Sequence, residues 1–266
     1  MNLEGNILKL KSDLKSPVDY QLPIGDELIR LNQFLGKKIR IEFKGQINCI
    51  HSGDKIKKSY NQGFSYKSFL KLACCDICIV KPELCHYSKG TCREPKWGEE
   101  NCFRPHIVYL ANTSSLKIGI TRESQIPTRW IDQGAVEALP LVRVPNRHAS
   151  GLLEVEIKRE INDKTNWRKM LSGSVEQIDL YEKREEIFDL YADLFDDLEA
   201  EDIDDKIIKI NYPVLEYPTK IKSLSFDKVN IVEGILLGIK GQYLIFDIGV
   251  INLRKHQGHY LYFSVD

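Results

Sequence analysis

Alternating apolar and polar residues mark both ends of the chain. The segments NILKLKSDL and KKIRIEFKGQINCI near the amino terminus place an apolar residue at almost every second position, as half-buried strands do. The tail, residues 219–265, has short β-rich runs separated by glycine or polar turns, a pattern typical of a small barrel or a meander. We therefore expect residues 1–68 and 207–266 to be β-rich and to contribute strands to a common sheet.

The middle of the chain predicts the order strand, strand, helix, strand, helix. VYLANTSSLKIGIT contains two β-rich runs joined by a polar turn, which indicates a hairpin. The segments TRWIDQGAVEA, LPLVRVPN and ASGLLEVEIKREI then predict a helix, a strand and a helix, and in the last segment Leu153, Ile157 and Ile161 recur at helical spacing. We assign this domain to residues 108–175.

An amphipathic helix is predicted within residues 176–206. Its apolar stripe consists of Ile178, Tyr181, Ile187, Leu190, Tyr191 and Leu194. The segment ends in acid-rich chain, so the simplest interpretation is a helix that packs on a core and continues into a solvated tail. The alternative is that this acidic helix binds a protein partner.

The composition is that of an ordinary globular protein. Apolar residues make up 42% and charged residues 29% of the 266 positions, which is enough chain for two or three units. No run approaches the roughly 18 uninterrupted apolar residues of a membrane span. The amino terminus also lacks the compact apolar run of a signal peptide. We expect no membrane association and a cytoplasmic location.

Positive and negative charges balance, with 38 of each, so the net charge does not indicate a polyanionic partner. The charges are unevenly placed, because residues 36–58 are basic and residues 189–205 are acidic. Two solvated surfaces and a basic groove for nucleic acid both remain open as explanations.

Residues 69–107 are loop-rich and contain closely spaced cysteines. Five of them follow the spacing C-x2-C-x6-C-x6-C-x9-C: Cys75, Cys78, Cys85, Cys92 and Cys102. Zinc prefers four Cys or His ligands, and a C-x2-C pair lets one tight turn supply two. The alternative is a set of buried free thiols, since disulfides are disfavoured in a reducing cytoplasm. We expect a structural Zn2+ held by four of the five, and the spacing does not show which one is spare.

A second pattern lies upstream in CIHSGDKIKKSYNQGFSYKS. Cys49, Ser52, Ser65 and Ser68 have the C-x2-C-x12-C-x2-C spacing of a zinc ribbon, with serine at three of the four positions. A serine hydroxyl does not bind zinc as a thiolate does, so we expect packing and hydrogen bonds to hold this loop. Chance placement of the serines is the alternative.

Ionisable residues gather around the predicted hairpin: Tyr109, Lys117 and Arg129, with Glu154 on the later helix. Phosphodiester hydrolysis needs a base for water, a cation beside the developing charge, and usually a divalent metal held by carboxylate. These residue types can supply those roles. Each also has a structural explanation, such as a core aromatic, an edge-strand charge or a solvated carboxylate.

VYL, followed by KIGIT and then Arg129, resembles the GIY-YIG nuclease superfamily, in a branch where KIG replaces YIG. The resemblance implies that Tyr109 activates water, Arg129 binds phosphate and Glu154 holds Mg2+ or Mn2+, with Glu156 as the alternative ligand. Lys117 takes the place of the second tyrosine and would orient water or contact phosphate.

Further contacts with a DNA or RNA substrate are expected, between which the sequence does not decide. One lies in DKTNWRKML, which combines a candidate helix cap, a Trp and basic residues, and for which a turn packed by Trp167 is the alternative. Gly119 matches the motif glycine, where a backbone passes close to its neighbour. The substrate-binding candidates are Gly119, Thr121, Trp130 and Asn166.

A longer resemblance covers most of the chain. CDICIVKPELCHYSKGTCREPKWGEENC, HIVYLANTSSLKIGIT, PTRWIDQGAVEALP, DKTNWRKML and GILLGIKGQYLIFDIGVINLRKH together resemble the uncharacterised bacterial family known as domain of unknown function 2797. This family brings no activity with it. The resemblance implies cysteines in that family where this chain has Ser52, Ser65 and Ser68, and hence the loss of one zinc site here.

The sequence therefore predicts an α+β protein with a central GIY-YIG-like domain, a zinc-binding segment and a β-rich domain formed by both ends of the chain. The expected domains are residues 1–68, 69–107, 108–175, 176–206 and 207–266. Three functions follow as hypotheses. The first is a metal-dependent nuclease. The second is a non-catalytic, zinc-containing module that binds nucleic acid or ribonucleoprotein, and the third is a zinc-stabilised protein-interaction module.

Overall fold

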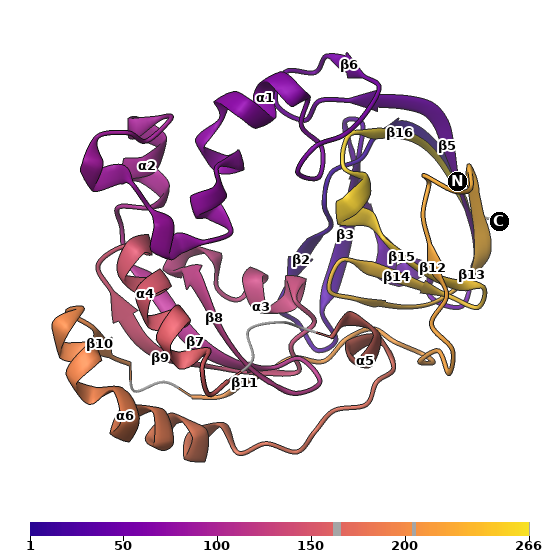
Figure 1. The fold of residues 1–266 in the computed structure, drawn as a ribbon. Coiled ribbons are helices and arrows are strands. Elements are labelled where there is room, and N and C mark those ends of the chain that lie inside the picture. The colour runs from indigo at the N-terminus through magenta and orange to yellow at the C-terminus, as the bar shows by residue number, and fades with distance from the viewer. Residues whose placement is uncertain (162–165, 204–205, 266) are drawn as a thin grey trace. The chain divides into compact units, whose positions relative to one another are not determined.

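Two compact units make up the chain in the computed structural model, which describes residues 1–161, 166–203 and 206–265. The first unit comprises Met1–Leu70, Leu171–Gly173 and Ile210–Asp266, and the second comprises Lys71–Met170 and Ser174–Lys209. Each unit has its own sheets and its own core (Figure 1).

The larger sheet of the first unit has the strand order β1-β16-β5-β13-β14-β15-β12, with β6 beside β5. Its strands are β1 (Asn2–Asn6), β5 (Lys38–Asn48), β6 (Lys55–Ile56), β12 (Ser223–Leu224), β13 (Ile231–Lys240), β14 (Tyr243–Phe246), β15 (Gly249–Asn252) and β16 (His259–Val265). A smaller sheet contains β2 (Lys11–Asp13), β3 (Asp19–Ile24) and β4 (Glu27–Arg30). Helix α1 spans Tyr66–Lys71.

Strands from the two ends of the chain share the larger sheet, as predicted. β16 pairs with β1 on one side and with β5 on the other. β13, β14 and β15 form the expected antiparallel meander. The expectation of a barrel was wrong for the described residues, because a barrel needs its two edge strands to pair, and this strand order ends at β1 and β12 without joining them.

The sheet of the second unit has the order β10-β9-β7-β8, and β11 also pairs with β9. Its strands are β7 (His106–Asn112), β8 (Leu116–Arg122), β9 (Glu137–Val144), β10 (Glu201–Asp202) and β11 (Ile208–Lys209). The helices that follow α1 along the chain are α2 (Pro95–Asn101), α3 (Thr128–Asp132), α4 (Arg147–Ile157), α5 (Trp167–Leu171) and α6 (Leu180–Asp197). From β7 to α4 the order is the predicted strand, strand, helix, strand, helix.

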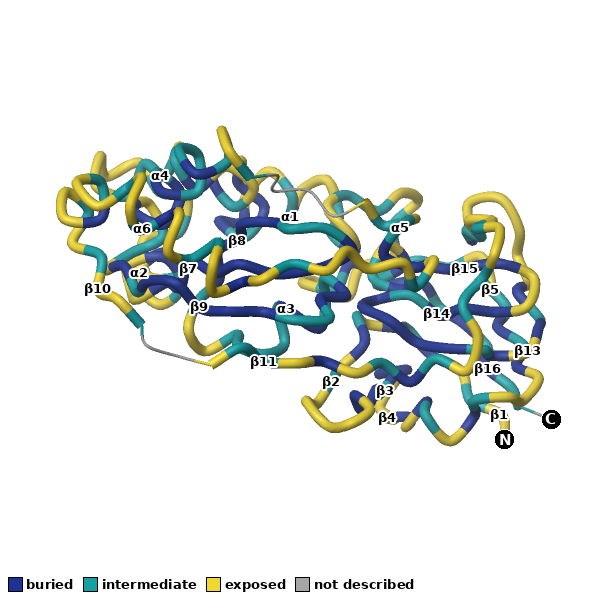
Figure 2. Tube along the Cα trace, turned by 90° about the horizontal axis from the view of Figure 1, so that it is seen from below, coloured by how far each residue is buried: buried dark blue, intermediate teal, exposed yellow. Residues whose placement is uncertain are grey.

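The β7–β8 hairpin has apolar side chains on one face and chemically active ones on the other. Val108 and Leu110 belong to a core that α4 and α6 cover. Because successive residues of a strand face opposite sides, Tyr109 lies on the other face with its cross-strand partner Gly119. β7 is buried along its whole length (Figure 2). The hairpin therefore holds a tyrosine in the protein interior.

Helix α6 spans Leu180–Asp197 and is therefore shorter than the predicted segment 176–206. Residues 204–205 of that segment lie outside the described residues. Asp179 caps the amino terminus of α6 by accepting hydrogen bonds from the backbone of Tyr181 at 2.9 Å and Glu182 at 3.1 Å. The predicted stripe was wrong at Leu190, which is 67% exposed. The backbone at Tyr191 is not helical, with φ −123° and ψ 18°, so the helical phase changes there.

The kink lets α6 bury a residue that the predicted stripe left out. Ile187 before the kink and Phe195 after it both pack in the core of the second unit. Although α6 has 18 residues, no helix in the described parts of the chain is long and apolar enough to cross a lipid bilayer.

Two buried histidines pack among aromatic rings in the first unit. The rings of His256 and His259 lie 4.9 Å apart, with Phe226 4.9 Å from His256 and Phe43 4.8 Å from His259. His256 is 3% exposed. Burial, together with a smaller effect of the neighbouring His259, lowers the pKa of His256 to about 4. The core of this unit thus contains an imidazole that is neutral at pH 7.

We expect the first unit to lose stability as the pH falls from about 6.5 to about 4. In this range the unfolded chain binds a proton at position 256 that the folded chain does not, so the free energy of unfolding decreases by up to about 3 kcal/mol. The substitution His256→Phe should flatten this part of the profile, measured by urea unfolding across the pH range. Exposed His51→Phe is the matched control, and an unchanged slope in His256→Phe would contradict the prediction.

Candidate active site and metal centre

A glycine on β8 makes room for the ring of Tyr109 on β7. The two residues are direct partners in the β7–β8 register. A Cβ atom at position 119 would lie 2.7 Å from both Cζ and Oη of Tyr109. Atoms do not pack that closely, so only glycine lets the tyrosine ring lie across this strand. This is the close backbone approach that the sequence led us to expect at Gly119.

The hydroxyl of Tyr109 lies among three other polar side chains. It donates a hydrogen bond to Oε1 of Gln133 at 3.1 Å. Burial raises the pKa of Tyr109, the positive charge and hydrogen bond of Arg129 act in the opposite direction, and the Glu154 carboxylate adds to the rise. The charges of Arg129 and Glu154, from two helices, therefore both act on the phenol of Tyr109.

Sequence reasoning missed Gln133. It stands four residues after Arg129, directly after the end of α3, so both side chains project on the same side of that turn. The four-residue spacing from Arg129 could have identified Gln133. A search for acidic and basic side chains, however, does not select an amide.

Glu154 and Glu156 lie on different faces of α4. Glu154 forms an ion pair with Lys158 at 3.2 Å, and its side chain is 13% exposed. Glu156 instead pairs with Arg159 at 2.5 Å, and its charge acts on Tyr191 of α6. Two residues along a helix correspond to about 200° of rotation, which explains the separation. Of the two carboxylates, Glu154 is the one whose charge acts on the tyrosine of β7.

Lys117 and Thr121 share the face of the hairpin that carries Tyr109. Lys117 pairs with Ala111 in the strand register and is 6% exposed. Thr121 pairs with Ile107, and its hydroxyl donates a hydrogen bond to the carbonyl of the next residue at 3.3 Å. These two candidates thus lie in one row with Gly119.

The remaining substrate-binding candidates occupy different environments. Trp130 is 1% exposed and packs edge-on against Tyr109, with 5.8 Å between ring centroids. Asn166 is exposed and uses its side-chain oxygen to accept a hydrogen bond from the backbone of Lys169 at 3.2 Å, which caps α5. Residues 163–165 of the DKTNWRKML segment lie outside the described residues.

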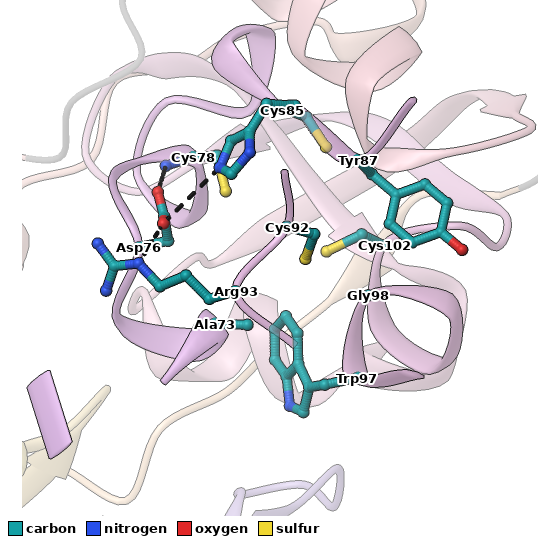
Figure 3. Close-up of a pocket in the computed structure, with 11 residues that line it drawn as sticks. Ala73, Asp76, Cys78, Cys85, Tyr87, Cys92, Arg93, Trp97, Gly98 and Cys102 are labelled. Carbon is teal, nitrogen blue, oxygen red and sulfur yellow. Dashed lines mark hydrogen bonds and ion pairs between the residues drawn. The ribbon is translucent and has the colours of Figure 1, made fainter. Parts of the chain in front are cut away.

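Four of the five candidate cysteines surround one small pocket. The pocket is lined by Ala73, Asp76, Cys78, Cys85, His86, Tyr87, Cys92, Arg93, Trp97, Gly98 and Cys102. Figure 3 shows the four cysteine side chains approaching this space from separate turns of the segment. Gly98 of α2 leaves room for the ring of Tyr87 and for Cys92, because a Cβ there would lie 2.9 Å from Cδ2 of Tyr87 and 3.2 Å from Sγ of Cys92.

Cys75, the first candidate along the chain, is not among these lining residues. It is 6% exposed, and its sulfur lies 4.0 Å from that of its neighbour Cys74. The pocket therefore brings Cys78, Cys85, Cys92 and Cys102 together as candidate ligands and leaves Cys75 outside its lining.

The thiols of Cys78 and Cys102 are neutral in the absence of a cation. Burial raises the pKa of Cys78 to about 12, and the charges of Asp76, Cys85 and Cys102 add to the rise. Burial also raises the pKa of Cys102, which the charge of Arg147 opposes. A bound cation would reverse this balance, because a metal favours the thiolate form of its ligands.

The donor set of the pocket fits zinc. Zinc takes thiolate, imidazole and carboxylate ligands. The group of ligand atoms that lie within 4.8 Å of one another consists of Asp76, Cys78 and His86, so Cys78 is the one cysteine of the four that belongs to it. Asp76 is already engaged by the Nε atom of Arg93 at 2.5 Å. The carboxylate is thus better placed beside a metal centre than on it.

The degenerate ribbon positions converge in the first unit. Sγ of Cys49 lies 3.5 Å from Oγ of Ser68 and accepts a hydrogen bond from the backbone N–H of Ser65 at 3.2 Å. Oγ of Ser65 donates to Oγ of Ser68 at 3.0 Å. Cys49, Ser65 and Ser68 thus form a hydrogen-bonded cluster, while the hydroxyl of Ser52 donates to Asp54 at 2.7 Å.

Hydrogen bonds hold Cys49 in its charged form. Burial acts to raise the pKa, but the hydroxyls of Ser52 and Ser68 and the N–H groups of Ser52 and Ser65 outweigh it, so the pKa of Cys49 falls to about 5. Ser65 and Ser68 supply hydrogen-bond contacts to this sulfur.

The basic run at residues 36–58 is largely neutralised where it forms β5. Arg40 pairs with Glu42 at 2.9 Å and with Glu233 of β13 at 3.0 Å. Lys38 also pairs with Glu233, at 2.5 Å, and Lys44 pairs with Glu42 at 2.9 Å. This strand carries a ladder of alternating charges, so it is a weak candidate for a nucleic-acid groove.

The fold and the site define a mixed α+β protein of two units, with a cluster of thiol, imidazole and carboxylate groups suited to a metal in the second unit. The family model described as "Protein of unknown function (DUF2797)" matches residues 36–261, and the chain belongs to this family. Comparisons with curated proteins and with solved structures found no match.

Proposed function

We propose that the protein is a metal-dependent nuclease of GIY-YIG type, acting on phosphodiesters of DNA or RNA. The proposal rests on one observation: the phenol of Tyr109 lies within the electrostatic reach of both Arg129 and Glu154. Hydrolysis of a phosphodiester needs a cation, a carboxylate and a hydrogen-bonding group close together. The charges of Arg129 on α3 and Glu154 on α4 both act on this phenol of β7, which supports the proposal.

Arg129 is the phosphate-binding group in this proposal. A guanidinium presents several N–H donors in a plane and remains charged throughout the reaction. It would bind the scissile phosphate and stabilise the negative charge that develops on its oxygens. Lys117, in the same row of the hairpin as Gly119, adds a second cation on that face.

Tyr109 acts as a hydrogen-bond donor in this proposal. Because burial raises its pKa, the phenol is protonated at neutral pH and does not itself remove a proton from water. It would orient the attacking water or a phosphate oxygen, while Gln133 fixes the direction of its hydroxyl. This differs from the base role that the family resemblance implies.

Glu154 is the residue that would hold Mg2+ or Mn2+. Such ions commonly bind through one or two carboxylates, with water and substrate phosphate as the other ligands. A bound ion would supply positive charge to the phosphate and lower the pKa of water. Glu154 would release Lys158, its present partner, to accept the ion.

A non-catalytic, zinc-containing module that binds nucleic acid is the second candidate. It is favoured by the burial of Tyr109, which is 0% exposed, and by the ion pair that occupies Glu154. A binding module would retain the fold without exposing either group to substrate.

We also propose that Cys78, Cys85, Cys92 and Cys102 bind one structural Zn2+. Their sulfurs line a common pocket within a segment that otherwise consists of short turns and one helix of seven residues. Such a segment buries little apolar surface, so a metal would contribute much of its stability.

Purified protein should contain one zinc ion per chain, measured by elemental mass spectrometry. Cys78→Ser should lose the metal, because it removes a ligand. Cys75→Ser is the matched control and should keep it, because Cys75 belongs to the same C-x2-C pair and is equally buried but does not line the pocket. Two zinc ions per chain, or equal loss in both variants, would contradict the assignment.

Arg129→Ala and Glu154→Gln should each reduce Mg2+- or Mn2+-dependent cleavage by at least about 100-fold, because each removes a charge that stabilises the transition state. The measurement is cleavage of labelled DNA and RNA, single- and double-stranded, with each metal. Arg143→Ala and Glu156→Gln are the matched controls, since Arg143 pairs with Glu123 and Glu156 lies on another face of α4.

The outcome separates the two candidate functions. Cleavage lost in both site variants and retained in both controls would support the nuclease. Binding of nucleic acid without cleavage by the wild-type protein, under every metal and substrate, would rule out the nuclease and favour the binding module.

A further inference from the structure

One helix contacts both the cysteine-rich segment and the candidate active site. α4 begins at Arg147, reaches Gly151 after one turn and carries Glu154 in the next. Because a helix is stiff over 11 residues, a displacement at its start moves the residues that follow. The contacts of these three residues show which groups each part of the helix touches.

Arg147 holds the backbone at two of the proposed zinc ligands. Its backbone N–H donates to the carbonyl of Cys102 at 2.9 Å. Its guanidinium donates to the carbonyl of Ile79 at 2.6 Å and, more weakly, to that of Cys78 at 3.5 Å. Arg147 thus links the turn that contains Cys78 to Cys102, which directly follows α2.

Gly151 brings the helix directly onto the turn between Cys78 and Cys85. A Cβ at position 151 would lie 2.4 Å from the backbone nitrogen of Glu83 and 2.6 Å from the carbonyl carbon of Pro82. Backbone rests against backbone here, with no flexible side chain to absorb a shift. A movement of this turn would therefore be passed to α4.

The charge of Arg147 also reaches the candidate active site. Its guanidinium interacts electrostatically with the thiols of Cys102 and Cys78 and with Arg129 and Glu154. Arg147 repels Arg129 and attracts Glu154. Its position therefore influences how the phosphate-binding and metal-binding groups are arranged.

We propose that Arg147 is a positioning residue through which the metal state of the cysteine cluster controls the geometry of the Tyr109–Arg129–Glu154 site. This inference rests on the proposed zinc site and deepens the proposed function by naming a means of regulation. Zinc fixes the turns that hold Arg147 and α4. When zinc is lost, the turns relax and Arg147 moves, which disturbs Arg129 and Glu154.

The coupling is reciprocal. If zinc binding favours one arrangement of the site, then a change that disfavours this arrangement must lower the affinity for zinc. Zinc affinity is therefore a readout that does not depend on cleavage.

The test compares Arg147→Gln with Arg159→Gln in the full chain. The control removes the same charge from an exposed arginine that follows α4 and pairs with Glu156. Two quantities are measured: zinc affinity by competition with a chromogenic chelator, and the 19F resonance of Tyr109 in protein labelled with 3-fluorotyrosine. The resonance is assigned with Tyr109→Phe.

We expect zinc removal from the wild-type protein to shift the Tyr109 resonance. Arg147→Gln should shift it in the same direction with zinc still bound, and should lower zinc affinity about 10-fold, the size of effect seen for groups that support metal ligands. Arg159→Gln should change neither quantity. If Arg147→Gln does not fold, Arg147→Lys, which keeps the charge but loses the forked donors, should show a smaller shift and a smaller loss.

A Tyr109 resonance that is unchanged both on zinc removal and in the folded Arg147 variant would overturn the proposal, as would wild-type protein that binds no zinc. Coupling observed in a protein that cleaves no nucleic acid would leave this inference standing and would count against the nuclease alone. Cleavage that persists unchanged without zinc would overturn the coupling and leave the nuclease standing.

Discussion

The close approach of the Tyr109 ring to the backbone of Gly119 is the constraint on which the candidate site depends. Without a side chain at position 119, the ring crosses the neighbouring strand and brings its hydroxyl to Gln133 and Arg129. Any larger residue would need to displace the ring or part the strands, which are paired along the whole hairpin. The absence of a side chain at position 119 thus fixes the position of the Tyr109 hydroxyl.

α4 gives this arrangement its second support. On one face it fills the core with Leu153 and Ile157, and elsewhere it presents Glu154 to the tyrosine and Arg147 to the cysteine-rich segment. The segment itself consists of short turns that bury little apolar surface. If the proposed zinc binds at its centre, the metal and the helix at the edge of the segment would depend on each other for position, which would couple metal loading to the geometry of the site.

The sequence predicted what depends on local pattern. Alternation and turn residues identified the hairpin, β5 and the order of elements through α4, because strand and helix periods appear directly in the residues. Two features depended on tertiary packing and were not visible: the open edge of the large sheet and the change of helical phase at Tyr191. Gln133 and Arg147 were missed because neither type stands out without knowledge of its neighbours.

We propose that Tyr109, Arg129 and Glu154 form a metal-dependent site, and anomalous diffraction from crystals soaked in Mn2+ can detect the metal there. With data at the zinc and manganese edges, we expect zinc among the cysteines and a manganese ion about 2.1 Å from a carboxylate oxygen of Glu154, on the side facing Tyr109. A fully soaked crystal with no manganese at Glu154, or with manganese only among the cysteines, would contradict the account.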